Sequence, residues 1–486
     1  MRHLTATPLM TPSPAGGSTV ATRLARSVLC REGGITDLAD FHRWLGDLGA
    51  RSYTNANPVR LHDVRDWVTD PTTGDISHRS GKFFAIQGLD IRNPGGKVER
   101  WAQPIINQPE TGILGMLVKE FDGVLHFLVQ AKAEPGNLNG LQVAPTVQAT
   151  RSNYTRVHGG AAVPYLKYFQ QPSGHRAVAD VRQSEQGAWF HKKRNRNMVA
   201  EATEDIQVLE GFRWLTLGQL HQLLSVEDLV NMDTRTVLSC LPLASPGLDE
   251  TFAPVGDFQT ALLCSMDPAA AGLHTTGEVL NWITDARTRV DVQLERVPLL
   301  YLPNWGYEEG RIVHDSGLFF DVIGVDIEAV GREVTRWMQP MIRPAGTGVI
   351  GLLVTRIDGV LHGLMHAHVE PGYVDVVELA PTVQCTPENY RYLPAAARPE
   401  FLDHVLAAAA DQVRFDTTLS EEGGRFYHAL NRYLVIEVEP DDVRESANYR
   451  WLTLHQLTEL LKHSYYVNVQ ARSLVACLHS LSGAAL

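Results

Sequence analysis

Hydrophobic residues follow two different spacings in the first half of the chain. In residues 37–48 and 213–224 they recur every three or four positions, which predicts two amphipathic helices. Residues 83–91 and 114–134 instead hold apolar runs that are typical of strands. An Asp-Gly step at 122–123 divides the longer run and predicts a tight hairpin turn. Helices and strands do not alternate strictly, so we expect an α+β fold, with a mixed sheet flanked by helices.

The second half of the chain repeats the first. A shift of 236 residues aligns Gly81–Tyr154 with Gly317–Tyr390 without a gap, and 36 of the 74 aligned residues are identical. The match continues on both sides of this stretch, and RWLTL occurs at 213–217 and again at 450–454. Two long copies of this kind indicate a tandem duplication of one domain rather than a solenoid.

Segments rich in Pro and Gly precede each copy. One lies at the N-terminus, and the other, LASPGLDETFAPVG, lies at 243–256. We therefore expect a flexible arm at 1–20, a first copy at 21–244, a linker at 245–256 and a second copy at 257–486.

Composition restricts the partners and the compartment. The formal net charge of -12 argues against a nucleic-acid partner. The N-terminus lacks the apolar core of a signal peptide and no run of 18 apolar residues is present, so we expect no membrane segment. The five cysteines are scattered without a CxxC pair, which predicts reduced thiols in a cytoplasmic protein. Among them, Cys385 is expected to be a small pocket-wall residue rather than a nucleophile.

One strongly repeated segment ends in polar residues. APTVQATRSNY, at 144–154, returns as APTVQCTPENY at 380–390. The shared Gln, Thr, Asn and Tyr offer hydrogen bonds without net charge. In the first copy, Arg151 adds a planar fork suited to a diphosphate. In the second copy, Pro387 has neither the charge nor a backbone donor, and Glu388 would repel a phosphate.

Other positions offer catalytic or binding groups. Lys132 and Glu134 share one polar face of a predicted strand, which either lines a pocket or faces solvent. Trp67 is either a cap on the core or a flat platform for a base. Ser184 and its counterpart Ser420 precede expected helices as N-caps do, where free N–H groups bind phosphate. Histidines cluster on this strand only in the second copy, so no shared metal site is expected.

The order of these motifs resembles one enzyme family. Both copies contain WxQP, DGVLH, EPG, APTVQxTxxNY and SE(E/Q)G followed by NR. This set resembles the NDP-hexose 2,3-dehydratases of deoxysugar biosynthesis, which include members of vancosamine- and epivancosamine-type antibiotic pathways. The resemblance implies a tandem duplication of a Nudix-hydrolase-like domain, and a homodimer. The carboxylate-rich box of true Nudix hydrolases is absent, so Mg²⁺-assisted diphosphate cleavage is not expected.

The resemblance also implies a reaction. Family members convert dTDP-4-keto-6-deoxy-D-glucose to dTDP-3,4-diketo-2,6-dideoxyglucose, which a partner 3-ketoreductase takes up. The C4 ketone acidifies the C3 proton, a base removes that proton, and the C2 hydroxyl leaves with the help of an acid. Glu134 is the expected base, Lys132 is expected to hold the C4 oxygen, and His62 is the expected acid. No cofactor is expected, in agreement with the lack of a GxGxxG fingerprint after a strand.

The duplication implies two pockets, with the chemistry confined to the first. The candidate residues His62, Lys132 and Arg151 have no equivalent in the second copy, which has Leu300, His368 and Pro387. The expected substrate pocket comprises Trp67, Ala149, Thr150, Arg151, Ser152, Asn153, Tyr154, Ser184, Gly187, Asn195 and Arg196. The expected second, non-catalytic pocket comprises Trp305, Cys385, Thr386, Pro387, Glu388, Asn389, Ser420, Gly423, Asn431 and Arg432. A metal-dependent nucleotide-sugar hydrolase and a non-catalytic sugar-nucleotide binding protein are the alternatives.

Overall fold

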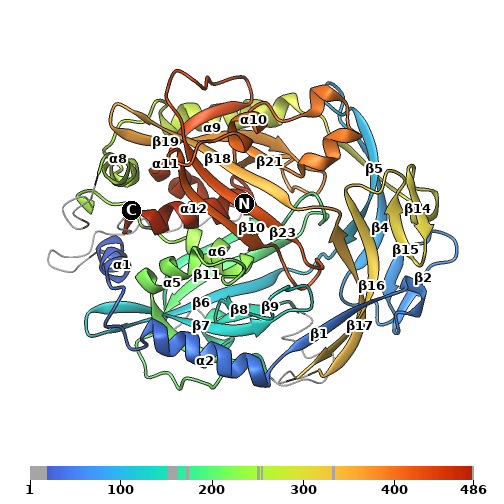
Figure 1. Cartoon of the computed structure of the whole chain (residues 1–486), viewed down its shortest axis with the longest axis horizontal. Helices are drawn as coiled ribbons and strands as arrows, with labels where there is room; N and C mark the ends of the chain where they lie inside the picture. The colour runs from blue at the N-terminus through green and yellow to red at the C-terminus, as the bar shows by residue number, and fades with distance from the viewer. Residues whose placement is uncertain are drawn as a thin grey trace, which may run out of the picture.

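The computed structural model describes residues 19–151, 162–170, 175–248, 252, 256–330 and 334–483. Its strands and helices form the mixed α+β architecture expected from the sequence. Figure 1 shows the large sheet of the first copy below that of the second, with helices between them and two smaller sheets to one side. Among the described residues, no helix is both long and apolar enough to span a membrane.

Each copy builds one seven-stranded sheet from its own residues. The central strands β6 and β11 run parallel, as do β18 and β23, and the remaining pairs are antiparallel. The first sheet contains β10 (Arg176–Ser184), β11 (Arg194–Glu201), β6 (Gly112–Phe121), β7 (Val124–Ala133), β12 (Phe212–Thr216), β8 (Leu141–Ala144) and β9 (Val147–Ala149). The second contains β20 (Val377–Ala380), β19 (Val360–Val369), β18 (Gly348–Ile357), β23 (Leu430–Glu437), β22 (Val413–Ser420), β21 (Val383–Cys385) and β24 (Tyr449–Thr453).

The predicted hairpin is present in both copies. β6 and β7 are joined by Asp122 and Gly123, whose φ angles of 48° and 80° lie in the left-handed region. Asp358 and Gly359 take the same conformation between β18 and β19. Both central residues of this turn need positive φ, which Asp tolerates and Gly adopts freely.

Helices pack against these sheets and against one another. The helix predicted at 37–48 is confirmed as α2 (Leu38–Arg51), capped by Asp37. The prediction for 213–224 is only partly correct, because its first residues form β12 and the helix α5 (Leu217–Leu224) begins after Thr216, whose side chain caps it. The other helices are α1 (Val20–Leu29), α4 (Lys167–Gln170), α6 (Met232–Ser239), α8 (Asp257–Met266), α9 (Thr276–Arg289), α10 (Leu402–Leu406), α11 (Leu454–Leu461) and α12 (Val469–Ser482).

The two smaller sheets exchange strands between the copies. β1 (Thr54–Val59) of the first copy pairs with β16 (Phe320–Ala329) of the second. In return, β13 (Gln293–Val297) of the second copy pairs with β4 (Ala85–Arg92) of the first. The remaining members are β2 (Trp67–Thr69), β3 (Ile76–His78) and β5 (Arg100–Asn107) beside β4, and β14 (Trp305–Glu308), β15 (Arg311–His314) and β17 (Arg336–Pro344) beside β16. Each copy therefore completes a sheet of the other.

Two buried arginines join the copies at their centre. Arg235 on α6 donates to the carbonyl of Ser420 in the second copy, and Arg472 on α12 donates to the carbonyl of Ser184 in the first. Both guanidinium groups are completely buried and make further hydrogen bonds within the α6–α12 contact. A buried guanidinium without such partners would be strongly destabilising, so these bonds fix the relative position of the copies.

Candidate active site

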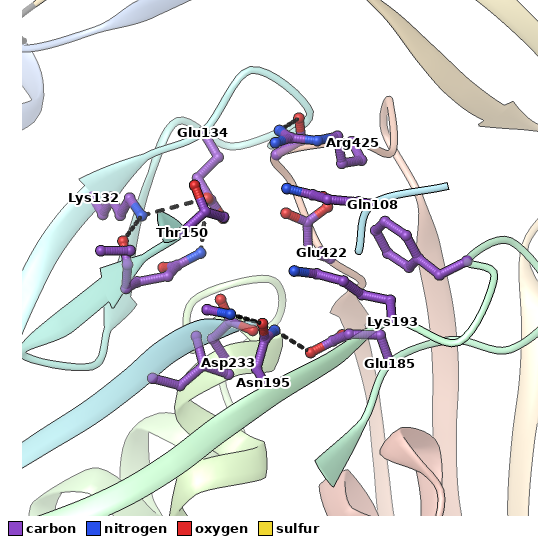
Figure 2. A pocket seen from close by; sticks show the side chains of 16 residues that line it. Gln108, Lys132, Glu134, Thr150, Glu185, Lys193, Asn195, Asp233, Glu422 and Arg425 are labelled. Carbon is purple, nitrogen blue, oxygen red and sulfur yellow. Dashed lines mark hydrogen bonds and ion pairs between the residues drawn. The ribbon is translucent and has the colours of Figure 1, made fainter. Parts of the chain in front are cut away.

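A polar cavity of about 100 Å³ opens beside the first large sheet, and residues of both copies line it. Figure 2 shows Lys132 and Glu134 on one side, Lys193 and Glu422 on the other, and Asp233 below. The lining residues are Gln108, Gly112, Leu114, Lys132, Glu134, Gln148, Ala149, Thr150, Glu185, Phe190, Lys193, Asn195, Asp233, Glu422, Gly424 and Arg425.

The first wall comes from the end of β7 and from β9. Lys132 and Glu134 are alternate residues on one strand face, so both side chains point into the cavity. The Lys132 ammonium lies 3.6 Å from Glu134 Oε1, and Gln148 donates to the same oxygen at 2.9 Å. Gln148 is in turn held by Asn231, which donates to its Oε1 at 3.2 Å. The carboxylate is therefore oriented on a rigid sheet with a cation beside it.

The opposite wall comes from the connection between β10 and β11 and from the start of β11. Asn195 donates to Glu185 Oε1 at 2.6 Å and accepts from the Gly112 backbone N–H at 3.0 Å. Lys193 is buried and donates to the Glu110 carbonyl at 2.6 Å. Burial lowers the pKa of Lys193 to about 8, while burial raises the pKa of Glu185. This wall thus offers a second lysine, whose proton is held less tightly than that of an exposed lysine.

The floor is the first turn of α6. Asp233 is 4% exposed, and its Oδ1 has no hydrogen-bond partner among the described residues. Burial, reinforced by the charges of Glu185, Glu134 and Glu422, holds the pKa of Asp233 well above its usual range. A carboxyl surrounded by other carboxyls retains its proton more easily, so the floor carries a neutral acid.

The third side is contributed by the second copy. Its residues Glu422, Gly424 and Arg425 follow β22 and lie against the turn that follows β7. The Gly136 backbone N–H donates to the Gly423 carbonyl at 2.7 Å, which fastens the two segments together. Burial raises the pKa of Glu422 to about 7 and lowers the pKa of Arg425. The cavity is therefore composite, and the first copy alone does not enclose it.

The equivalent place in the second copy keeps two carboxyl–amide pairs of the cavity but lacks several of its other ionisable groups. Gln384 donates to Glu370 at 2.7 Å and Asn431 donates to Glu421 at 2.7 Å, as Gln148 and Asn195 do in the first copy. The sequence alignment places His368 at the position of Lys132, Ala429 at that of Lys193, Gln470 at that of Asp233, Gln186 at that of Glu422 and Trp189 at that of Arg425.

Five predicted pocket residues lie together in the cavity. Glu134, Lys132, Ala149, Thr150 and Asn195 all line it. The polar face predicted either to line a pocket or to face solvent therefore lines the cavity at the end of β7.

His62 lies elsewhere. It is on the short turn η1 (Leu61–Asp63), its side chain is 59% exposed, and its Nε2 lies 3.6 Å from Asp63. His62 is not among the residues that line the cavity, so its assignment as the acid has no support from this geometry.

The two tryptophans contact the opposite copy. Trp67 donates from its indole nitrogen to the Met338 carbonyl at 2.9 Å, and Trp305 donates to the Ala102 carbonyl at 2.7 Å. Both also pack in one apolar cluster that joins the copies. Their indole N–H groups are thus used in the structural contact, which favours the core-cap interpretation over a base platform.

The prediction that Ser184 and Ser420 are helix N-caps is wrong. Ser184 ends β10 and Ser420 ends β22, and each is followed by a turn rather than a helix. Both are buried and belong to the contact between copies, where Ser184 donates to Glu378 and Ser420 accepts from Gln142 at 2.8 Å. Their burial in strands leaves no free helix end for a phosphate.

The glycines of the SE(E/Q)G motif face the opposite sites. A Cβ on Gly187 would lie 2.9 Å from Glu370 of the second site, whereas a Cβ on Gly423 would lie 3.0 Å from Glu134 Cβ of the first. The arginines of the NR pair face away from both: Arg196 pairs with Asp180 at 2.6 Å, and Arg432 pairs with Asp416 at 2.6 Å. The SE(E/Q)G motif of each copy therefore lies beside the site of the other copy.

The polar end of the repeated segment differs between the copies. Arg151 is exposed beside the cavity residue Thr150, and residues 152–154, predicted to bind substrate as Ser152, Asn153 and Tyr154, lie outside the described residues. In the second copy, Thr386 precedes the turn η3 (Pro387–Arg391), which contains Glu388. Asn389 accepts from the Phe319 backbone N–H at 3.1 Å, which is a structural contact.

Cys385 carries a protonated thiol. Burial raises its pKa to about 12, so the thiolate required of a nucleophile is not formed near neutral pH. This agrees with its interpretation as a wall residue.

Sequence reasoning missed most of the charged residues of the cavity. Glu185 and Glu422 lie inside the SE(E/Q)G motif but were not among the predicted residues, and Lys193, Asp233 and Arg425 lie outside the repeated motifs. A signal for four of them existed: Lys193, Asp233, Glu422 and Arg425 are each replaced by a residue without charge when the copies are aligned.

Comparison with known proteins agrees with the duplication. The NDP-hexose 2,3-dehydratase family matches residues 38–241 and, separately, 276–478. A solved structure, the Ap4A hydrolase of C. elegans, aligns at 18% identity over 24% of this chain and 87% of that chain. Its TM-score of 0.17 is too low to assign a fold.

Three curated relatives cover nearly the whole chain, and each is named dTDP-4-dehydro-6-deoxy-alpha-D-glucopyranose 2,3-dehydratase. The protein of Saccharopolyspora spinosa is 48% identical over 468 residues, or 96% of both chains. Those of Streptomyces violaceoruber and Amycolatopsis orientalis are 48% and 42% identical, over 92% and 95% of this chain and 98% and 94% of theirs. The chain therefore belongs to the NDP-hexose 2,3-dehydratase family.

Proposed function

We propose that this enzyme removes water across C2–C3 of dTDP-4-keto-6-deoxy-D-glucose and forms dTDP-3,4-diketo-2,6-dideoxyglucose for deoxysugar biosynthesis. The supporting observation is a carboxylate and two lysines facing one cavity in a member of this family. Three relatives over 40% identical carry the name of this activity. The reaction requires a base, an acid and a cation near the developing enolate, and the cavity holds side chains of all three kinds.

In the proposed mechanism, Glu134 removes the C3 proton. A hydrogen bond from Gln148 orients its Oε1. Glu134 directly follows strand β7, and the sheet restricts rotation of its side chain. The electron pair moves into the C4 carbonyl, and the negative oxygen is stabilised by the Lys132 ammonium. In a partly dry cavity this Coulomb interaction is stronger than in water.

The C2 hydroxyl then leaves as water, which requires a proton from an acid. We place that acid inside the cavity rather than at the exposed His62. The resulting enol tautomerises to the 3-ketone. Each step moves protons between the substrate and side chains, so the mechanism uses no redox cofactor.

The decisive experiment is incubation of the protein with dTDP-4-keto-6-deoxyglucose, followed by NMR. Loss of the C2 hydroxyl is the expected result, with a 3-ketoreductase present to trap the unstable product. Release of dTMP in the presence of Mg²⁺ would instead indicate the hydrolase alternative. Binding without loss of the hydroxyl and without exchange of the C3 proton in D₂O would indicate the non-catalytic alternative.

We further propose that the second site binds a nucleotide sugar without converting it. It keeps Glu370, Gln384, Glu421 and Asn431, but has no counterpart of Lys132, Lys193 or Glu422. Calorimetric titration with dTDP should then give two sites per chain, and substitutions at the second site should leave turnover unchanged.

The resemblance and, for the compartment, the scattered cysteines support four further proposals. Each copy is a Nudix-like domain without a functional hydrolase box, the enzyme is a cytoplasmic homodimer, and its product passes to a 3-ketoreductase. Sedimentation of the purified protein tests the dimer. Coupled turnover with the reductase tests the transfer of the product.

A further inference from the structure

The second copy inserts one carboxyl into the site of the first. Glu422 lies in the turn between β22 and β23, and hydrogen bonds at both ends of this turn fasten it to Gly136 of the first copy. The Gly136 N–H donates to the Gly423 carbonyl at 2.7 Å, and the His428 N–H donates to the Gly136 carbonyl at 2.9 Å. A Cβ on Gly136 would lie 1.7 Å from the Phe426 carbonyl oxygen, so only glycine permits this approach.

This placement brings Glu422 close to Glu134. A Cβ built on Gly424 would lie 2.4 Å from Glu422 Oε1 and 3.7 Å from Glu134 Oε1. The two oxygens are therefore separated by no more than the sum of these distances. Figure 2 shows the side chains of Glu134 and Glu422 on opposite sides of the cavity.

The surroundings of Glu422 favour a proton on it near neutral pH. Its Oε2 is buried and accepts no hydrogen bond within the described part of the chain. Burial, and then the charge of Glu134, raise its pKa to about 7, against the opposing effect of Arg425. The other charged groups that face it are Glu185, Asp233 and Lys193.

The second site lacks this group. The position of Glu422 is occupied there by Gln186, an amide that donates to Glu421 at 2.7 Å and has no proton to give to a leaving group. The base position, by contrast, is a glutamate in both sites, Glu134 and Glu370. A carboxyl at this particular position therefore distinguishes the first site.

We propose that Glu422, from the second copy, is the catalytic acid that protonates the departing C2 hydroxyl while Glu134 serves as the base. This deepens the proposed function and rests on it. Ionised Glu134 takes the C3 proton, the C2–O bond breaks, and neutral Glu422 gives its proton to the leaving oxygen, which departs as water. In the tautomerisation, Glu134 returns its proton to C2 and Glu422 takes the proton of the C3 hydroxyl. Both carboxyls thus return to their starting states, and no net proton is consumed.

The test is Glu422→Gln in the full-length protein, with Glu439→Gln as a surface control in the same copy. Both variants are checked for folding by thermal unfolding. With dTDP-4-keto-6-deoxyglucose, we expect elimination by Glu422→Gln to slow by about 10²–10⁴-fold, the usual contribution of a general acid. Exchange of the C3 proton in D₂O should continue, because Glu134 remains. Loss of exchange together with elimination would overturn the assignment as acid.

A substrate with a better leaving group provides an independent test. Fluoride departs without full protonation, so the 2-deoxy-2-fluoro analogue should react with Glu422→Gln within about tenfold of the unsubstituted enzyme. An equal loss with both substrates would overturn the proposal, as would unchanged turnover of the natural substrate. Neither result would affect the proposed function, which depends on water loss catalysed by the unsubstituted enzyme.

Discussion

The two sites of this protein have the same scaffold and different charges. In both, a glutamate after the hairpin accepts from a glutamine, and a second glutamate accepts from an asparagine. Around this shared frame, the first site has Lys193, Asp233 and Arg425, where the second has Ala429, Gln470 and Trp189. The same carboxyl–amide hydrogen bonds thus occur in both copies, while the proposed reaction depends on ionisable groups that only the first site has.

The comparison also explains why both copies are needed. The segment after β22 covers the first site, and the segment after β10 covers the second. Trp189, which aligns with Arg425, packs edge-on against Phe426 with a distance of 4.6 Å between the ring centroids. A duplicated protein can therefore specialise one site by changing residues that belong, in the chain, to the other copy.

Replacing the glutamate at the base position should have the largest difference in effect on kcat between the two sites. We expect Glu134→Gln to lower kcat by about 10³-fold, because an amide cannot accept the C3 proton. Glu370→Gln should leave kcat within about twofold. Steady-state turnover with product trapping measures both. Equal losses would place chemistry in both sites, and full turnover by Glu134→Gln would remove it as the base.

Lys193 should give the next largest effect. Lys193→Met should lower kcat by about 10²-fold, because it removes one of the two lysines that face the cavity in which the enolate forms. The pKa of about 8 adds a pH test. As the pH rises through 8 the ammonium loses its proton, so kcat/KM should fall there in the unsubstituted enzyme. The Lys193→Met profile should lack this fall, and a persisting fall would assign it to another group.

A smaller effect on kcat is expected when one methyl group is added at Gly424. Gly424 has Ala188 at the equivalent position of the second site, and its φ angle is not in the left-handed region. Gly424→Ala should lower kcat by about tenfold, because the methyl would meet Glu422 and approach Glu134. Ala188→Gly is the matched control and should leave kcat unchanged. A normal kcat for Gly424→Ala would show that the two carboxyls need not keep this spacing.

The smallest effect is expected at Arg151. It is exposed, so loss of its charge in Arg151→Ala should raise KM for the nucleotide sugar by about fivefold. Asn389→Ala, in the corresponding segment of the second copy, should leave turnover intact but lower the unfolding temperature, since Asn389 accepts from Phe319. Loss of turnover only in Asn389→Ala would reverse the assignment of the two sites.

The sequence by itself determined the features that depend on neighbouring residues. The duplication followed from identical positions, and the Asp-Gly hairpin followed from turn chemistry. Lys132 and Glu134 were placed on one face because side chains alternate along a strand. Family membership followed from the order of the repeated motifs.

The tertiary structure alone decided how the copies combine. Strands β1 and β13 pair with the opposite copy, and Glu422 reaches Glu134 from nearly 300 residues away. No periodicity in the chain encodes such contacts, because they arise from the packing of two similar surfaces around Arg235 and Arg472. The sequence therefore specified two related copies, and only the fold decided which residues of each copy line the cavity.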